Sequence, residues 1–119
     1  MKKFVMDGET SSITLVSPRQ AFEGMQNGEL TLVDVRQPEE WAFDGSPKGA
    51  NQVALQRKDF VDQVTDLVTN QKETPVAVCC RSGLRGKKAG KLLQASGFAN
   101  VVNVEGGMMR WLAEKLPVA

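Results

Sequence analysis

The sequence of 119 residues contains no histidine. This absence excludes Cys-His and Ser-His catalytic pairs, and it excludes every metal site that needs an imidazole ligand. The chain has two cysteines, Cys79 and Cys80, and because they are adjacent they can form neither a structural zinc site by themselves nor a C-x-x-C redox pair. A disulfide between neighbouring residues would be strained, so we expect both thiols to be free.

Long apolar runs are also missing, and no stretch approaches the roughly 18 residues that span a bilayer. The opening MKKF leads into polar DGETSS rather than a secretory segment, so we expect a cytoplasmic protein without a membrane partner. A net charge of +1 gives no general reason to expect a nucleic-acid partner. Positive charge is instead concentrated over residues 81–91, which contain five cations and no acid.

Apolar periodicity predicts alternating strands and helices in one domain. We expect strands at 13–16, 30–35, 52–55, 75–80 and 101–104, and helices at 18–27, 38–43, 58–69, 87–96 and 106–116. Ser17, Pro18 and Gln20 are typical of an N-cap, a first-turn proline and a capping-box partner. The order predicts an α/β domain over 12–119, with a parallel sheet covered by helices on both faces, after a loosely ordered segment 1–11.

The segment CRSGLR, residues 80–85, follows a predicted strand and precedes a predicted helix. In parallel sheets, ligands bind beyond the carboxyl ends of the strands. A thiolate is favoured there by the helix N-terminus, by backbone amides and by nearby cations. Gly83 and Gly86 allow a tight turn that aims amides inward, and a thiolate that already exists needs no general base. The segment therefore predicts an anion cradle with a nucleophilic cysteine at its base.

CRSGLRGKKAGKLLQASGFANVVNVEGGMMRW, together with the upstream LVDVRQPEEW, resembles the single-domain rhodaneses, the thiosulfate sulfurtransferase family. The resemblance covers residues 12–116. It implies a three-layer rhodanese-like fold with a five-stranded parallel sheet, a catalytic Cys80, and no cofactor or metal. It also implies a substrate-binding loop formed by Arg81, Ser82, Gly83, Leu84 and Arg85.

The resemblance implies ping-pong sulfur transfer. The Cys80 thiolate would attack the outer sulfur of a small anionic donor, such as thiosulfate, a persulfide or a polysulfide. The resulting Cys80 persulfide would pass its sulfur to a thiol or to cyanide. We expect Arg85, which closes the loop, to contact the dianionic donor and Arg81 to face solvent. No oligomeric state is predicted.

Two alternatives remain open. Five residues separate Cys79 from Arg85, which is the spacing of tyrosine phosphatases and related arsenate reductases, whereas four separate Cys80 from Arg85. We favour Cys80, because Cys79 continues the apolar strand and free cysteine is commonly buried. The other alternative is a non-catalytic rhodanese-like module that binds a partner.

Rhodaneses often have serine or threonine after the loop arginine, where this chain has Gly86. We expect a serine at this position to donate a hydrogen bond to the thiolate, worth about 1.5–3 kcal/mol for a charged acceptor, unless Ser82 already does so.

Three further expectations concern packing. Asp34 and Arg36 resemble the structural ion pair of the family, which we expect Glu40 to join. Four apolar residues at helical spacing indicate the helix after the loop; they are Ala89, Leu92, Leu93 and Ala95. The residues of the last helix expected in the core are Met108, Met109 and Trp111.

Overall fold

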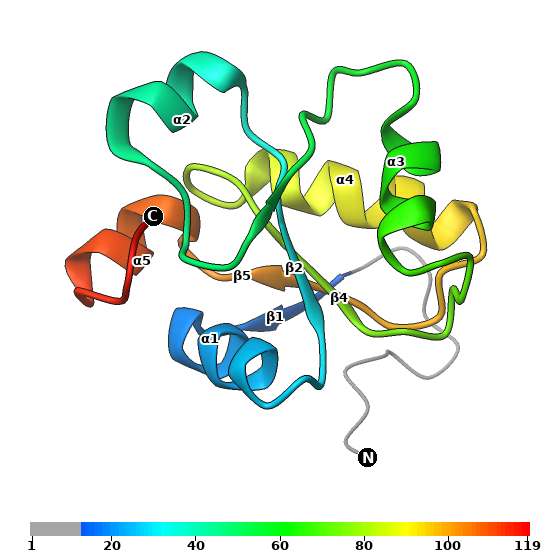
Figure 1. The fold of residues 1–119 in the computed structure, drawn as a ribbon, viewed down its shortest axis with the longest axis horizontal. Helices are drawn as coiled ribbons and strands as arrows, with labels where there is room; N and C mark the ends of the chain where they lie inside the picture. The colour runs from blue at the N-terminus through cyan, green and yellow to red at the C-terminus, as the bar shows by residue number, and fades with distance from the viewer. Residues whose placement is uncertain (1–12) are drawn as a thin grey trace.

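A computed structural model describes residues 13–119, and the expected loose segment 1–11 lies outside the described residues. Strands and helices alternate, as the sequence predicts (Figure 1). In chain order the elements are β1 (Thr14–Val16), α1 (Pro18–Gln26), β2 (Thr31–Asp34), α2 (Pro38–Asp44), β3 (Asn51–Gln52), α3 (Phe60–Leu67), β4 (Val76–Cys79), α4 (Leu84–Ala95), β5 (Val101–Val104) and α5 (Gly107–Ala113). Among residues 13–119, no helix has the length and apolar character needed to cross a bilayer.

The five strands form one parallel sheet in the order β1-β5-β4-β2-β3. β4 lies at the centre, and its last residue, Cys79, pairs with Asp34 of β2. The third strand is shorter than expected, although the amides of Val53 and Leu55 still donate to β2 and to the residue after it. The parallel sheet with crossover helices confirms the predicted α/β class.

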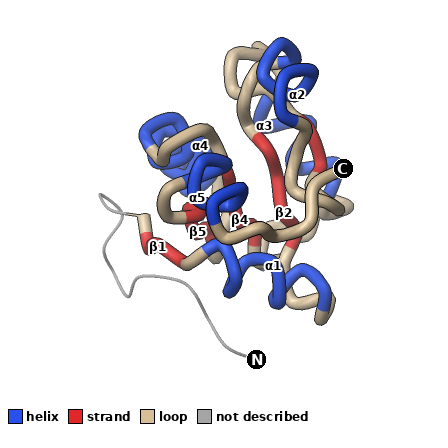
Figure 2. Tube along the Cα trace, turned by 90° about the vertical axis from the view of Figure 1, so that its left-hand side faces the viewer, coloured by secondary structure: helices blue, strands red, loops and turns tan. Residues whose placement is uncertain are grey.

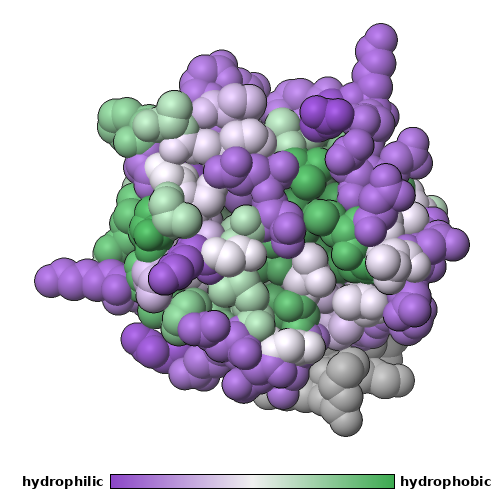
Figure 3. All heavy atoms as spheres, viewed as in Figure 1, coloured by the Kyte–Doolittle hydropathy of each residue, from purple (hydrophilic) through white to green (hydrophobic). Residues whose placement is uncertain are grey.

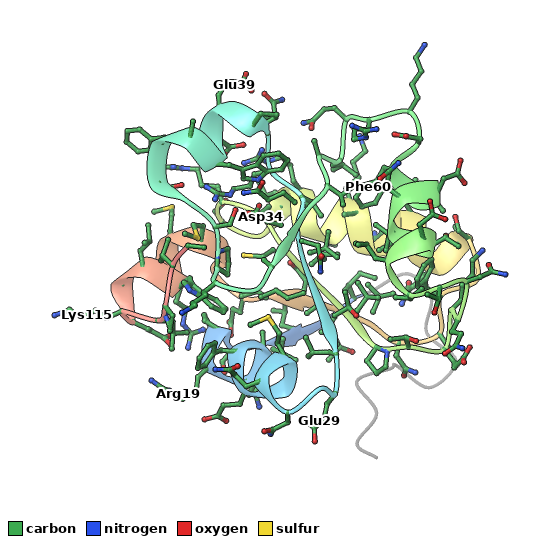
Figure 4. All side chains as sticks on the ribbon, in the orientation of Figure 1. Arg19, Glu29, Asp34, Glu39, Phe60 and Lys115 are labelled. Atoms are coloured by element: carbon green, nitrogen blue, oxygen red, sulfur yellow. The ribbon has the colours of Figure 1, made fainter. Side chains whose placement is uncertain are left out.

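Two apolar cores lie on opposite faces of the sheet. On one face α3 and α4 pack Val64 and Leu93 against the strands, and on the other α1 and α5 pack Ala21 and Trp111. Figure 1 shows α1 and α5 on the lower left side of the sheet and α3 and α4 on the upper right side, and Figure 4 shows Phe60 at the start of α3. Both faces of the sheet are covered, as expected of a three-layer fold.

Local signals place the helix ends well. In α1 the Ser17 hydroxyl accepts from the Gln20 amide at 3.0 Å, and the Gln20 side chain accepts from the Ser17 amide at 2.8 Å, which confirms the capping box. The largest differences at the helix ends are three residues: α5 ends at Ala113 instead of Leu116, and α4 begins at Leu84 instead of Lys87. The first turn of α4 therefore belongs to the predicted cradle.

One packing expectation is wrong. Met109 is 53% exposed, because it lies on the outward side of α5, while Met108 and Trp111 are buried. In α4, Leu92 is 41% exposed and Leu93 is buried. On the face seen in Figure 3, green apolar patches lie among purple polar side chains.

A buried ion cluster joins α2 to the end of β2. Arg36 pairs with Asp34 at 3.0 Å and with Asp44 at 2.8 Å, so the expected third partner, Glu40, is wrong. Asp44 takes this place because it ends α2, where the Arg36 guanidinium reaches both Asp44 Oδ1 and the Gly45 carbonyl; Figure 4 labels Asp34 at this position. Burial disfavours the charge of Arg36, but hydrogen bonds to Asp34 and Asp44 outweigh it and raise the pKa of the guanidinium. The cluster holds α2 beyond the carboxyl end of β2 (Figure 2).

Candidate active site

The loop from Cys80 to Arg85 joins the central strand β4 to α4 and wraps around the Cys80 sulfur. Cys80 Sγ accepts hydrogen bonds from the amides of Gly83 at 3.0 Å and Gly86 at 3.2 Å. Gly86 lies in the first turn of α4, where backbone N–H groups have no partner within the helix. The sulfur uses one of these donors and lies at the positive end of the helix dipole. Both contacts direct partial positive charge at Sγ.

Gly83 gives the loop its shape. Its φ of +125° is a conformation that side-chain-bearing residues rarely adopt, and it is the N-cap of α4. Its amide points to the sulfur, while its carbonyl accepts from the Lys87 amide at 3.0 Å and from Asn103 Nδ2 at 2.9 Å. The turn at Gly83 therefore directs the donor inward and the acceptor outward.

The N-terminus of α5 supports the other side of the loop. The Met108 amide donates to the Cys80 carbonyl at 2.7 Å, and the Met109 amide donates to the Arg81 carbonyl at 3.1 Å. The Cys80 carbonyl also accepts a weak hydrogen bond from Cys79 Sγ at 3.6 Å. Both carbonyls are thus hydrogen-bonded away from the loop interior, where the amides of Gly83 and Gly86 face Sγ.

Asn103 is a site residue that the sequence analysis missed. It lies on β5, is 2% exposed, and holds the Gly83 carbonyl, while its Oδ1 has no hydrogen-bond partner within the described residues. A signal was present, because a polar residue in the middle of the apolar strand VVNV needs a buried partner. The oxygen lies over Gly86, which has no side chain to occupy the space.

Arg85 is held by Glu40 of α2. Two parallel hydrogen bonds join the guanidinium to the carboxylate, NH1 to Oε1 at 2.5 Å and NH2 to Oε2 at 2.8 Å. The hydrogen bond from Arg85 lowers the pKa of Glu40 to about 2, so the carboxylate is charged at neutral pH. The pair closes the loop against α2, and it balances the charge of Arg85 that was expected to face the donor.

The other loop residues predicted to bind substrate lie at the surface. Arg81, Ser82 and Leu84 are exposed, and Leu84 is 82% exposed. Within the described residues Arg81 has no ion pair, so its charge is not balanced by a carboxylate. The Ser82 hydroxyl has no hydrogen bond to the sulfur there either. The structure thus brings Gly83 to the sulfur and leaves these three side chains around the mouth of the loop.

Cys79 lies outside the cradle. Its side chain is fully buried in the core between the sheet and α1 and α5, on the opposite face from the core that contains Cys80. Burial, with a smaller effect from the charge of Asp34, raises the pKa of the Cys79 thiol and keeps it neutral. Both cysteines are free thiols. The phosphatase-like spacing from Cys79 to Arg85 therefore corresponds to no anion site around Cys79.

Comparison with known proteins agrees with this geometry. A family model described as a rhodanese-like domain matches residues 17–114. The chain is 32% identical over 107 residues to the thiosulfate sulfurtransferase GlpE of Haemophilus influenzae, covering 87% of this chain and 91% of that protein. The solution structure of a polysulfide-sulfur transferase homodimer from Wolinella succinogenes superposes with a TM-score of 0.73 at 32% identity, covering 95% of this chain and 82% of that one.

A second group of relatives is longer. The chain is 36% identical over 107 residues to a tRNA uridine(34) hydroxylase of Picosynechococcus sp., covering 89% of this chain. It spans only 35% of that protein, so it corresponds to about a third of it. Both groups of relatives match nearly 90% of this chain, most of which the rhodanese-like family model also matches.

Proposed function

The chain belongs to the family of rhodanese-like domains, and from this we propose that it is a sulfurtransferase in which Cys80 carries the sulfur as a persulfide. The observation that carries the proposal is the pair of amides, from Gly83 and Gly86, that point at Cys80 Sγ. They support the proposal because they would stabilise negative charge on the nucleophile without a histidine, which this chain lacks. The names of the GlpE and Wolinella relatives make thiosulfate and polysulfide the first donors to test.

In the first half-reaction, the Cys80 thiolate attacks the outer sulfur of thiosulfate. A bond forms between Sγ and that sulfur, the sulfur–sulfur bond of thiosulfate breaks, and its electron pair leaves with sulfite. In the second half-reaction, cyanide or a thiolate attacks the outer sulfur of the persulfide. Thiocyanate or a new persulfide leaves, and the electron pair of the broken bond regenerates the Cys80 thiolate.

The residues of the loop divide this work. The amides of Gly83 and Gly86 hold negative charge on Sγ before the first step and after the second, so they stabilise both the nucleophile and the final leaving group. Arg81 is the exposed cation next to Cys80 and would attract an anionic donor. Arg85, neutralised by Glu40, would hold the loop closed against α2.

The direct test is an intact mass measurement. Purified protein, reduced and then freed of reductant, is incubated with thiosulfate, and in parallel with polysulfide. The proposal expects a mass gain of one sulfur atom that a thiol reductant or cyanide reverses, with thiocyanate formed in the cyanide reaction.

Two variants locate the adduct. Cys80→Ser should take up no sulfur while remaining folded, and Cys79→Ala should take up sulfur as the wild type does. If Cys79→Ala alone lost the adduct, Cys79 would be the nucleophile. If no donor gave an adduct on the folded wild type, the proposal would be wrong and a non-catalytic binding module would be favoured.

A further inference from the structure

The outward side of α4 carries a groove of about 400 Å³ that begins at the active-site loop. We call this surface the α4 face; its residues are Leu84, Lys87, Lys88, Lys91, Leu92 and Ala95. They recur at intervals of three and four, so they form one stripe along a helix of 12 residues, about 18 Å long. Figure 2 shows α4 at the outside of the molecule.

The floor of the groove is apolar and uncovered. Leu84 is 82% and Leu92 41% exposed, and Ala95 is also exposed. Exposed apolar side chains that gather in a groove, rather than scatter singly, are typical of interaction surfaces. Leu84 belongs both to this floor and to the loop around Cys80, so an occupant of the groove would reach the mouth of the active site.

The rim of the groove is cationic and uncompensated. Lys87, Lys88 and Lys91 are exposed, and α4 contains no acidic residue. Within residues 13–119 every ion pair uses an arginine, and none uses a lysine. Lys87 also lines a second hollow of about 320 Å³ with Ser82 and Gly83, so the positive rim extends to the loop.

These lysines do not stabilise the helix that carries them. Lys87 and Lys91 are four residues apart, where like charges destabilise a helix. Lys87 and Lys88 lie in its N-terminal half, the end at which cations are disfavoured. Their position is therefore unfavourable for α4 itself and suits an external negative charge.

We propose that the α4 face docks an acidic protein whose thiol accepts the sulfur from Cys80. The proposal rests on the sulfurtransferase function. The occupant would place an apolar side chain on the leucine floor and carboxylates against the lysine rim, with its cysteine at the mouth of the loop. A nucleic acid fits less well, because the α4 face has an apolar floor and no aromatic side chain on which a base could stack.

The test uses synthetic acceptor peptides. One contains a cysteine and a leucine flanked by glutamates, and its partner has lysines in place of the glutamates. Wild-type protein is loaded with sulfur, freed of donor and mixed with each peptide or with cyanide. We expect the acidic peptide to accept sulfur about tenfold faster than the basic one at low salt, with the difference shrinking as salt rises.

Variants then assign the preference to the α4 face. Replacing the three rim residues together, as Lys87→Gln, Lys88→Gln and Lys91→Gln, should abolish the preference and leave the rate with cyanide unchanged. A matched control removes the same charge from exposed lysines elsewhere and should keep the preference; its substitutions are Lys48→Gln, Lys58→Gln and Lys115→Gln.

Binding without chemistry separates the two proposals. Fluorescence anisotropy measures binding of the acidic peptide with its cysteine replaced by serine, so a protein that takes up no sulfur can still be tested. If the rim variant loses this binding and the control variant keeps it, the docking surface is supported. Equal rates and equal binding for the two peptides would overturn it. Displacement of the acidic peptide by a single-stranded RNA at equal or lower concentration would also overturn it and assign the α4 face to nucleic acid.

Discussion

Replacing Gly86 with serine tests how the cradle is packed. From the sequence we expected the serine hydroxyl to add a donor to the thiolate. The backbone would permit a side chain, because Gly86 lies within α4 and is absent from the glycines with positive φ. The space is occupied, however: a Cβ would lie 2.9 Å from Cγ of Asn103 and closer still to its Oδ1. We therefore expect Gly86→Ser to distort the loop instead of strengthening it.

The cost follows from what Asn103 must give up. It is 2% exposed and cannot swing into solvent, so relieving the overlap means moving β5 or breaking its hydrogen bond to the Gly83 carbonyl. Overpacking a core costs about 1–3 kcal/mol and a lost hydrogen bond about 0.5–1.5 kcal/mol. Serine gains at most about 0.5 kcal/mol of helix propensity over glycine. If both costs are incurred, the net loss in the free energy of unfolding should be about 1–4 kcal/mol.

A double-mutant cycle measures the effect. Urea unfolding in reducing buffer compares the wild type, Gly86→Ser, Asn103→Ala and the double variant. Removing the Asn103 side chain clears the space, so the double variant should be at least about 1 kcal/mol more stable than additivity predicts. The Gly86→Ser protein should also load sulfur more slowly, because the loop amides lose their alignment with Sγ. A Gly86→Ser variant as stable as the wild type, or additive effects, would refute the reasoning.

Three further predictions concern the cysteines and the Arg85–Glu40 pair. Cys79→Ala should lower the free energy of unfolding by about 1 kcal/mol, measured in urea, because it removes one buried sulfur from the core; an unchanged value would mean that the site repacks. Arg85→Ala should slow sulfur loading from thiosulfate and from a neutral persulfide donor by similar factors, since Glu40 already balances the guanidinium; a loss confined to thiosulfate would instead indicate direct contact with the dianion. The pKa of Glu40 is lowered from 4.5 to about 2, so the stability from this pair is complete above about pH 4.5 and lost as the pH falls toward 2. Because the pair is about a quarter exposed, the free energy of unfolding of the wild type should exceed that of Glu40→Gln by only about 1 kcal/mol at neutral pH. A difference independent of pH would contradict this.

The elements of the fold were predictable because their signals are local. The capping box of α1 lies within four residues, and the apolar strands reveal themselves by continuous runs between turn residues. The position of Cys80 followed from the same order, since a residue at the end of a central parallel strand must lie at the ligand-binding edge of the sheet. Orientation around the helices was less predictable: Leu92 and Leu93 are adjacent and equally apolar, and only the packing of α4 on the sheet decides that Leu93 is buried.

The partners of the loop were not predictable, because they are distant in sequence. Glu40 lies 45 residues before Arg85, and Asn103 lies 20 residues after Gly83. From the sequence we expected Arg85 to face the donor and Glu40 to join Arg36, which lies four residues before it. Only the placement of α2 beyond the carboxyl edge of the sheet brings Glu40 to the loop and Asp44 to Arg36.

This dependence on distant partners bears on what the motif CRSGLR can do by itself. The loop points amides at the sulfur only because its carbonyls are taken elsewhere, by the α5 amides at Cys80 and Arg81 and by Asn103 at Gly83. These contacts fix the loop in the shape that leaves the amides of Gly83 and Gly86 free to donate to Sγ. A chain that contains the same six letters but lacks an equivalent of Asn103 or of the α5 contacts need not aim its amides at the cysteine. The cradle is thus a property of the sheet edge and its helices, and the loop sequence supplies the cysteine and the glycines that let those contacts form.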